Sequence, residues 1–116
     1  TDPLERLRAY VGYWEGCIAD ATHSFCICAL LATEIPVLPE AVAVEVRAHF
    51  RSLSNWLSSV LERGAAQGRI VLAGSAEADA EMFMATVHGA MLSARAYGEA
   101  RKFADITRPL LERITP

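Results

Sequence analysis

The residues of this chain whose chemistry could support a metal site are its three cysteines and three histidines. Cys26-x-Cys28, with Cys17 and His23 nearby in the sequence, invites a zinc interpretation. However, residues two apart on a helix point to widely different sides. Structural zinc sites also favour more widely spaced cysteine pairs, with a second pair elsewhere. We therefore expect no metal site.

A catalytic cysteine would need a general base and a third group that orients the base. His49 and His88 are candidate bases. The charged residues near them in the sequence, Glu45, Arg47 and Arg51, fall on what the pattern indicates is a solvated face. We expect no catalytic residue and no cofactor, although a small helical enzyme with an apolar substrate remains an alternative.

Composition indicates one folded domain. The chain has 116 residues, of which 53% are hydrophobic and 22% charged, so disorder is not expected. The net charge of −3 and pI near 5.6 disfavour a surface that neutralises phosphates, so we expect no DNA contact by this segment. No apolar run is long enough for a membrane span, and no basic leader precedes one. An odd number of cysteines without a secretory signal favours reduced thiols and a cytoplasmic location.

The hydrophobic period predicts an all-α chain. Asp2-Pro3 is typical of a helix start, and apolar residues then recur at steps of three and four as far as Ala21. Thr22-His23-Ser24 interrupts this pattern. A short helix follows over about 25–34, and because it is apolar nearly all round we expect it to be buried.

Three longer segments complete the prediction. Pro39-Glu40 begins a helix that runs to about Gln67, with Gly68 as a left-handed cap and a loop over 69–75. Ser75 caps a fourth helix over 76–97, which Gly98 ends. A fifth helix spans about 100–114, and Pro109 should bend it or remove one hydrogen bond.

The order of these segments resembles the C-terminal half of TetR-type transcriptional regulators. The features that carry the resemblance are a short Cys- and Leu-containing helix ending at Glu34, a Leu38-Pro39 break, a helix closing on Gly64-x-x-x-Gly68, and a following helix with Gly89-Ala90. No segment resembles the N-terminal helix-turn-helix of that family. The resemblance implies one domain over 1–116 that binds an effector and dimerises, with the DNA-binding domain missing.

The predicted fourth helix is apolar on two sides. One stripe is large, with Phe83, Val87, Met91 and Tyr97, and the other is small, with Ala85, Gly89, Ser93 and Ala96. A five-helix chain offers one natural interior, so we expect the second stripe to be covered by another copy. The resemblance implies that the last two helices form a four-helix bundle in a homodimer. The residues we expect at this interface are Met84, His88, Gly89, Met91, Leu92, Arg95, Phe103, Ile106 and Leu110.

Apolar and aromatic residues on the inward faces of the first three helices are suited to an apolar or aromatic small molecule. The same residues would suit an ordinary core, which sequence alone does not distinguish from a cavity. The expected walls are Trp14, Ile18, Leu31, Leu53, Trp56, Leu57 and Val87. The alternative to an effector domain is a stand-alone helical dimerisation or adaptor module with a solid interior.

Overall fold

The computed structural model describes residues 2–20 and 26–116, which form five α-helices and one turn of 3₁₀-helix. Within these residues there is no strand, so the predicted all-α class is confirmed. No helix formed by them combines the length and the hydropathy that a membrane span requires.

Helix α1 spans Pro3–Asp20. As predicted, Asp2 caps it: Oδ1 of Asp2 accepts a hydrogen bond from the backbone N–H of Leu4 at 3.0 Å. Leu7 and Val11, on the stripe spaced by three and four residues, are almost fully buried. The break expected at Thr22-His23-Ser24, and the histidine of the zinc interpretation, lie outside the described residues.

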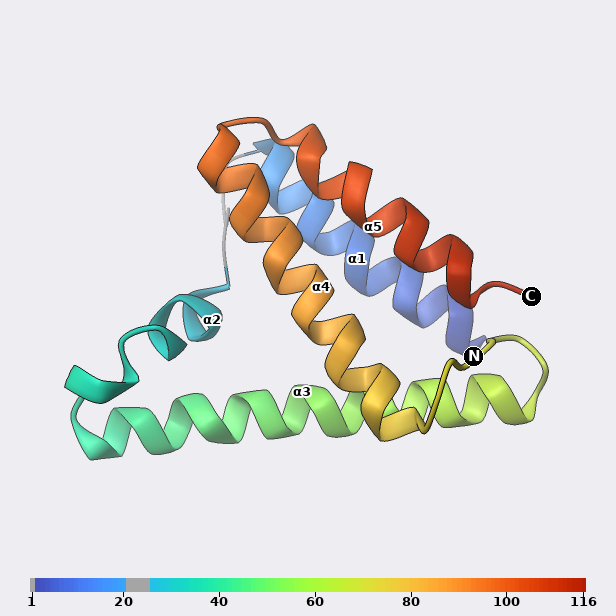
Figure 1. Ribbon diagram of the computed structural model, residues 1–116, viewed down its shortest axis with the longest axis horizontal. Coiled ribbons are helices and arrows are strands. Elements are labelled where there is room, and N and C mark those ends of the chain that lie inside the picture. The colour runs from blue at the N-terminus through green and yellow to red at the C-terminus, as the bar shows by residue number, and fades with distance from the viewer. Residues whose placement is uncertain (1, 21–25) are drawn as a thin grey trace.

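Helix α2 is shorter than predicted, spanning Ile27–Ala32, and a 3₁₀ turn, η1, follows over Ile35–Val37. The expectation that this segment is buried is wrong. Ile27 is 69% exposed and Leu30 43% exposed. The reason is its place in the fold, because α2 packs mainly against the amino-terminal part of α3, where that helix extends past the other helices (Figure 1).

Helix α3, Glu40–Ala66, ends as its sequence predicts. Gly68 has a φ of 71°, a left-handed conformation that glycine adopts without the penalty that a Cβ brings. The N–H groups of Arg69 and Ile70 then donate to the Gly64 carbonyl, at 2.8 and 3.1 Å, and turn the chain back. Ile70 packs onto Gly64, so the chain reverses its direction in a tightly packed turn at the end of α3.

Helix α4, Ala76–Tyr97, is also capped as predicted. The Ser75 hydroxyl accepts from the N–H of Ala78 at 3.1 Å, and Gly98 ends the helix with a φ of 66°. Asp79 adds a feature that the sequence did not reveal. Its carboxylate accepts from the N–H groups of Ala73 and Gly74, at 2.7 and 3.1 Å, and thereby orders the preceding loop.

Helix α5, Arg101–Ile114, carries Pro109 inside it, on the exposed side. The helix runs antiparallel to α4, with α1 behind the pair (Figure 1). Its carboxyl end is tied to the loop after α3, because the N–H of Val71 donates to the Ile114 carbonyl at 2.8 Å.

The core lies among α1, α3, α4 and α5. Each large apolar side chain buried there stabilises the fold by about 1.5–3 kcal/mol. The largest fully buried apolar side chains are Leu7, Leu57, Leu61, Phe83, Met91 and Phe103. One side of α4 therefore belongs to the protomer core, and the other side is left for a different role.

Candidate functional site: an aromatic groove and the outer face of α4

An aromatic groove lies between α1 and α3. It has a volume of about 600 Å³ and is lined by Arg6, Ala9, Tyr10, Tyr13, Trp14 and Trp56. Tyr10 and Trp14 are one turn apart on α1, so both rings project from the same side of that helix. The ring of Tyr10 lies 5.8 Å from that of Trp56, centre to centre, and Tyr13 meets Trp14 edge-on at 5.2 Å. These are favourable aromatic geometries.

Tyr10 contributes a buried hydroxyl group to this groove, which Arg6 and Tyr13 also line. Burial raises the pKa of its hydroxyl to about 12, helped by the nearby Cys26 thiol. The phenol is therefore neutral at physiological pH and available as a hydrogen-bond donor or acceptor. Mostly aromatic walls with a few polar groups are typical of small-molecule sites.

Two histidines, His49 and His88, lie outside the lining of the groove, near Cys26 and Phe50. Sγ of Cys26 is 4.0 Å from Nε2 of His49, and the ring of His88 meets that of Phe50 at 5.4 Å. Nε2 of His88 is buried and has no hydrogen-bond partner within 2–20 and 26–116. Burial, with a smaller contribution from His49, lowers the pKa of His88, so its imidazole is neutral near pH 7.

Cys26 and Cys28 do not converge on a common centre. Cys26 is buried against His49, Cys28 is half-buried, and Cys17 is buried on α1; all three are free thiols. In the described part of the chain, no three or more His, Cys, Asp or Glu side chains are close enough to hold a metal ion.

The structure brings together only some of the residues expected to form ligand walls. Trp14 and Trp56 share the groove, and Leu53 packs half-buried against the core. Leu57 and Val87 have no exposed surface, because they face the centre of the helix bundle, so they are core residues here.

The other two expected wall residues lie apart from the groove. Leu31 is half-buried on α2. Ile18 lines a separate hollow of about 230 Å³ with Arg95, at the end of α4. Tyr10, Tyr13, Arg6 and Ala9 were not among the expected walls. The one-turn spacing of Tyr10 from Trp14 was the sequence signal for the first of them.

The outer face of α4 is the second feature of functional interest. We call Met82, Ala85, Gly89, Leu92, Ser93 and Ala96 the outer stripe. Met82 is 62% exposed and Leu92 56% exposed, and a Cβ added at Gly89 would meet no described atom within 4 Å. This surface carries no charged side chain and is apolar over four turns of helix.

Several residues expected at a dimer interface lie elsewhere. Met84, Met91 and Phe103 are buried in the protomer core, because successive residues turn by about 100° and theirs point inward. His88 faces Phe50 on α3, and Arg95 faces Ile18 on α1. The expected residues on or beside the outer stripe are Gly89, Leu92, Ile106 and Leu110.

A further hollow of about 460 Å³ opens between α4, α5 and the loop after α3. We call it the α4–α5 hollow. Met82, Phe83 and Thr86 line it from α4, and Ile106, Pro109, Leu110, Arg113 and Ile114 from α5. Leu61, Val71, Leu72, Ala73 and Asp79 complete its lining.

Comparison with known proteins is consistent with this architecture. A family model described as the C-terminal domain of tetracyclin repressor-like proteins matches residues 3–110. A TetR-family transcriptional regulator from Agrobacterium tumefaciens shares 77% identity over all of this chain, with a TM-score of 0.97. A regulatory protein TetR from Rhodobacter sphaeroides has the same fold at 21% identity over 99% of the chain, with a TM-score of 0.85. This chain spans 61% of each of those two chains. No curated protein matches it.

Proposed function

Because the chain belongs to the family of tetracyclin repressor-like C-terminal domains, we propose that it is the effector-sensing and dimerising part of a TetR-like transcriptional regulator. Its effector is an apolar or aromatic small molecule, and its partner is a second copy of the same chain. DNA is bound by an N-terminal domain outside this sequence, in the cytoplasm. The groove formed by Tyr10, Trp14 and Trp56 is the observation that carries the proposal.

The chemistry of the groove suits an uncharged aromatic effector. Its rings come from two helices, so a bound molecule would contact α1 and α3 at once. The neutral hydroxyl of Tyr10 can orient a hydroxyl or carbonyl group on the ligand. The positive charge of Arg6, which also lines the groove, would allow a ligand with one acidic group to bind.

Dimerisation is supported by the outer stripe. Soluble monomers seldom leave a contiguous apolar surface without a partner. A two-fold axis through this face would bring the α4 and α5 helices of two protomers into a four-helix bundle. The family to which the chain belongs favours the same pair of helices.

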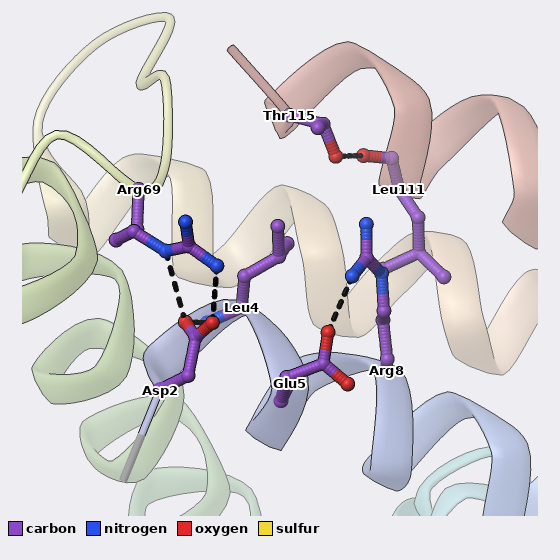
Figure 2. A network of polar contacts seen from close by, with 7 residues as sticks. All are labelled: Asp2, Leu4, Glu5, Arg8, Arg69, Leu111 and Thr115. Carbon is purple, nitrogen blue, oxygen red and sulfur yellow. Dashed lines mark hydrogen bonds and ion pairs between the residues drawn. The ribbon is translucent and has the colours of Figure 1, made fainter.

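A signal from the groove to a DNA-binding domain would pass through α1. Arg69, on the loop after α3, donates to Asp2, so the start of α1 is fixed to the end of α3 (Figure 2). A molecule that binds more tightly to one packing of α1 against α3 would shift this connection. It would thereby change the separation of the two DNA-binding domains on their half-sites.

Tryptophan fluorescence tests the ligand site directly, because both tryptophans of the chain line the groove. We expect a brominated alkylbenzene to quench the emission saturably, through contact with the heavy atom. Trp14→Phe and Trp56→Phe should each leave half of the quenchable signal. Tyr10→Ala should weaken binding, whereas Tyr97→Ala, at an exposed site remote from the groove, should leave it unchanged.

An adaptor module with a solid interior is the second candidate. The closed packing of Leu57 and Val87 favours it, because neither is exposed to a cavity. Linear quenching without saturation, together with an unchanged melting temperature in the presence of the probe, would contradict effector sensing and leave the adaptor interpretation.

A further inference from the structure

We propose that the Cys26 thiol, assisted by His49, reacts covalently with electrophilic molecules that enter the aromatic groove. The class of molecule is an α,β-unsaturated carbonyl compound that carries an aromatic ring, which is flat and uncharged. Covalent capture rests on the ligand groove proposed above and deepens that proposal, because it names the reacting group of the ligand. Each chain undergoes one addition, without catalytic turnover.

The Cys26 thiol has a base beside it. Cys26 immediately precedes α2, and His49 lies on α3, 23 positions later in the sequence. Sγ of Cys26 is 4.0 Å from Nε2 of His49, within reach of a hydrogen bond to sulfur. Because the thiolate is the nucleophile, an imidazole that can accept the thiol proton makes a cysteine reactive. In the described part of the chain, neither Cys17 nor Cys28 has a histidine at this distance.

Tyr10 connects this thiol with the groove. Its side chain lines the groove with Trp14 and Trp56. The Cys26 thiol is also close enough to Tyr10 to contribute, after burial, to the raised pKa of the Tyr10 hydroxyl. That hydroxyl keeps its proton near neutral pH, so it can donate a hydrogen bond to the carbonyl oxygen of a ligand. A ligand held in this way would place its carbon–carbon double bond beside the Cys26 thiol.

A buried nitrogen near the same pair lacks a partner. Nε2 of His88, on α4, makes no hydrogen bond to any residue within 2–20 and 26–116. His88 is close enough to His49 for the latter to contribute to its lowered pKa. Buried polar atoms are nearly always hydrogen-bonded, so an exception calls for a role such as ligand binding. The start of α2, α3 and α4 therefore bring a nucleophile, a base and an unsatisfied polar atom into one region.

The addition requires no second reactant. Sγ of Cys26 forms a bond to the β-carbon of the ligand, and the electron pair of the carbon–carbon double bond moves toward the carbonyl oxygen. The thiol proton passes to Nε2 of His49 and then to the α-carbon of the ligand, so the imidazole returns to its starting state. The Tyr10 hydroxyl stabilises the negative charge that develops on the carbonyl oxygen. The product is a thioether that retains every atom of the ligand.

Cys28 provides an internal comparison. It is half-buried, whereas Cys26 is only 8% exposed. Burial first, and Cys26 second, raise the pKa of Cys28, which lowers its thiolate fraction. Exposure alone would therefore favour reaction at Cys28, and the contact with His49 favours reaction at Cys26.

Mass spectrometry of the wild-type chain tests the inference, with benzylideneacetone as the probe. We expect one adduct per chain, with the whole mass of the probe, and peptide mapping should place it at Cys26. Labelling of Cys26 should be about tenfold or more faster in the folded chain than in urea, because only the folded chain holds His49 beside the thiol. Adducts that form first at Cys28 or Cys17, or a Cys26 that reacts no faster when folded, would overturn the inference.

Two substitutions separate the roles of the assisting residues. His49→Gln should slow the labelling of Cys26 by about tenfold or more, because it removes the base. Tyr10→Phe keeps the aromatic ring and removes the donor, so it should also slow labelling. The matched control is Tyr13→Phe, which removes the hydroxyl of the other tyrosine in the groove and should leave the rate unchanged. Unchanged labelling in both His49→Gln and Tyr10→Phe would contradict the assisted addition.

A saturated analogue distinguishes failure of this inference from failure of the proposed function. Benzylacetone has the same ring and carbonyl group but no double bond, so it can occupy the groove without forming an adduct. In excess it should slow the labelling of Cys26. Saturable quenching by the brominated alkylbenzene without an adduct at Cys26 would overturn covalent capture and leave the effector groove intact. An adduct at Cys26 whose formation benzylacetone does not slow would overturn the groove as the route to the thiol.

Discussion

Asp2 and Arg69, 67 positions apart in the sequence, hold the first turn of α1 against the loop that follows α3 (Figure 2). Nε of Arg69 donates to Oδ1 of Asp2 at 3.4 Å, and Nη2 of Arg69 donates to Oδ2. Oδ1 of the same carboxylate also accepts from the N–H of Leu4. One side chain therefore caps a helix and fixes a loop.

The ion pair predicts how stability changes in acid. The hydrogen bond from Arg69 is the largest cause that holds the pKa of Asp2 below its ordinary value of 3.8. A carboxyl with a lowered pKa contributes stability above its ordinary value, and this is lost as the pH falls through the native pKa. Arg69→Gln should reduce the loss of stability below about pH 4. Urea unfolding from pH 5 to pH 2 measures this, and an unchanged pH profile would contradict it.

His88 predicts a second pH dependence, nearer neutrality. Burial first, and His49 second, lower the pKa of His88 below its ordinary value of 6.5. The unfolded chain then takes up a proton before the folded one, so this contribution to stability is complete above about pH 6.5 and is lost as the pH falls toward the native pKa. His88→Gln should flatten the profile between pH 7 and pH 5. His49→Gln removes only the smaller of the two causes that lower the pKa of His88, so it should flatten the stability profile less. A larger effect of His49→Gln than of His88→Gln would be evidence against this assignment.

Gly64 and Ile70 predict a large difference between two similar substitutions. A Cβ at Gly64 would lie 2.3 Å from Cδ1 and 3.0 Å from Cβ of Ile70, whose backbone N–H is bonded to the Gly64 carbonyl. Gly64→Ala should therefore cost about 1–3 kcal/mol. Gly12→Ala, on an open site of α1, should instead stabilise by about 0.5–1 kcal/mol. Equal effects in chemical denaturation would show that Ile70 moves aside without penalty.

Gly89 predicts opposite effects on the protomer and on its association. Because no described atom lies near its missing Cβ, Gly89→Ala should make α4 of the protomer more stable. In a dimer that associates through the outer stripe, to which Gly89 belongs, the added methyl group would separate the two surfaces and raise the dissociation constant. Sedimentation at several concentrations measures association, and denaturation in the monomeric range measures protomer stability. Gly12→Ala should raise stability without changing association.

The sequence allowed the helix boundaries to be predicted closely, because local chemistry decides them. Asp2, Ser75, Gly68 and Gly98 each supply a cap whose geometry depends on a few neighbouring residues. The exposure of α2 could not be predicted in this way. It depends on how far α3 extends past the bundle, which is a property of the whole fold.

Prediction of the candidate sites was less complete. Trp14 and Trp56 were identified because large aromatics on inward stripes tend to meet, but the contribution of Tyr10 depends on the angle between α1 and α3. Met84, Met91 and Phe103 were wrongly expected at an interface. Their apolar character is the same in a protomer core as in a contact between protomers, so only the rotation of each helix distinguishes the two.

Light scattering coupled to size-exclusion chromatography most directly tests the central claim, which is that two copies of this chain associate through the outer stripe of α4. The chain has a mass of 12.6 kDa, and we predict that the wild type elutes at twice that value. Ala85→Glu, which places a charge at an exposed position of the stripe, should elute as a folded protomer. A wild type of single-protomer mass at high concentration, or an Ala85→Glu variant that remains dimeric, would contradict the account.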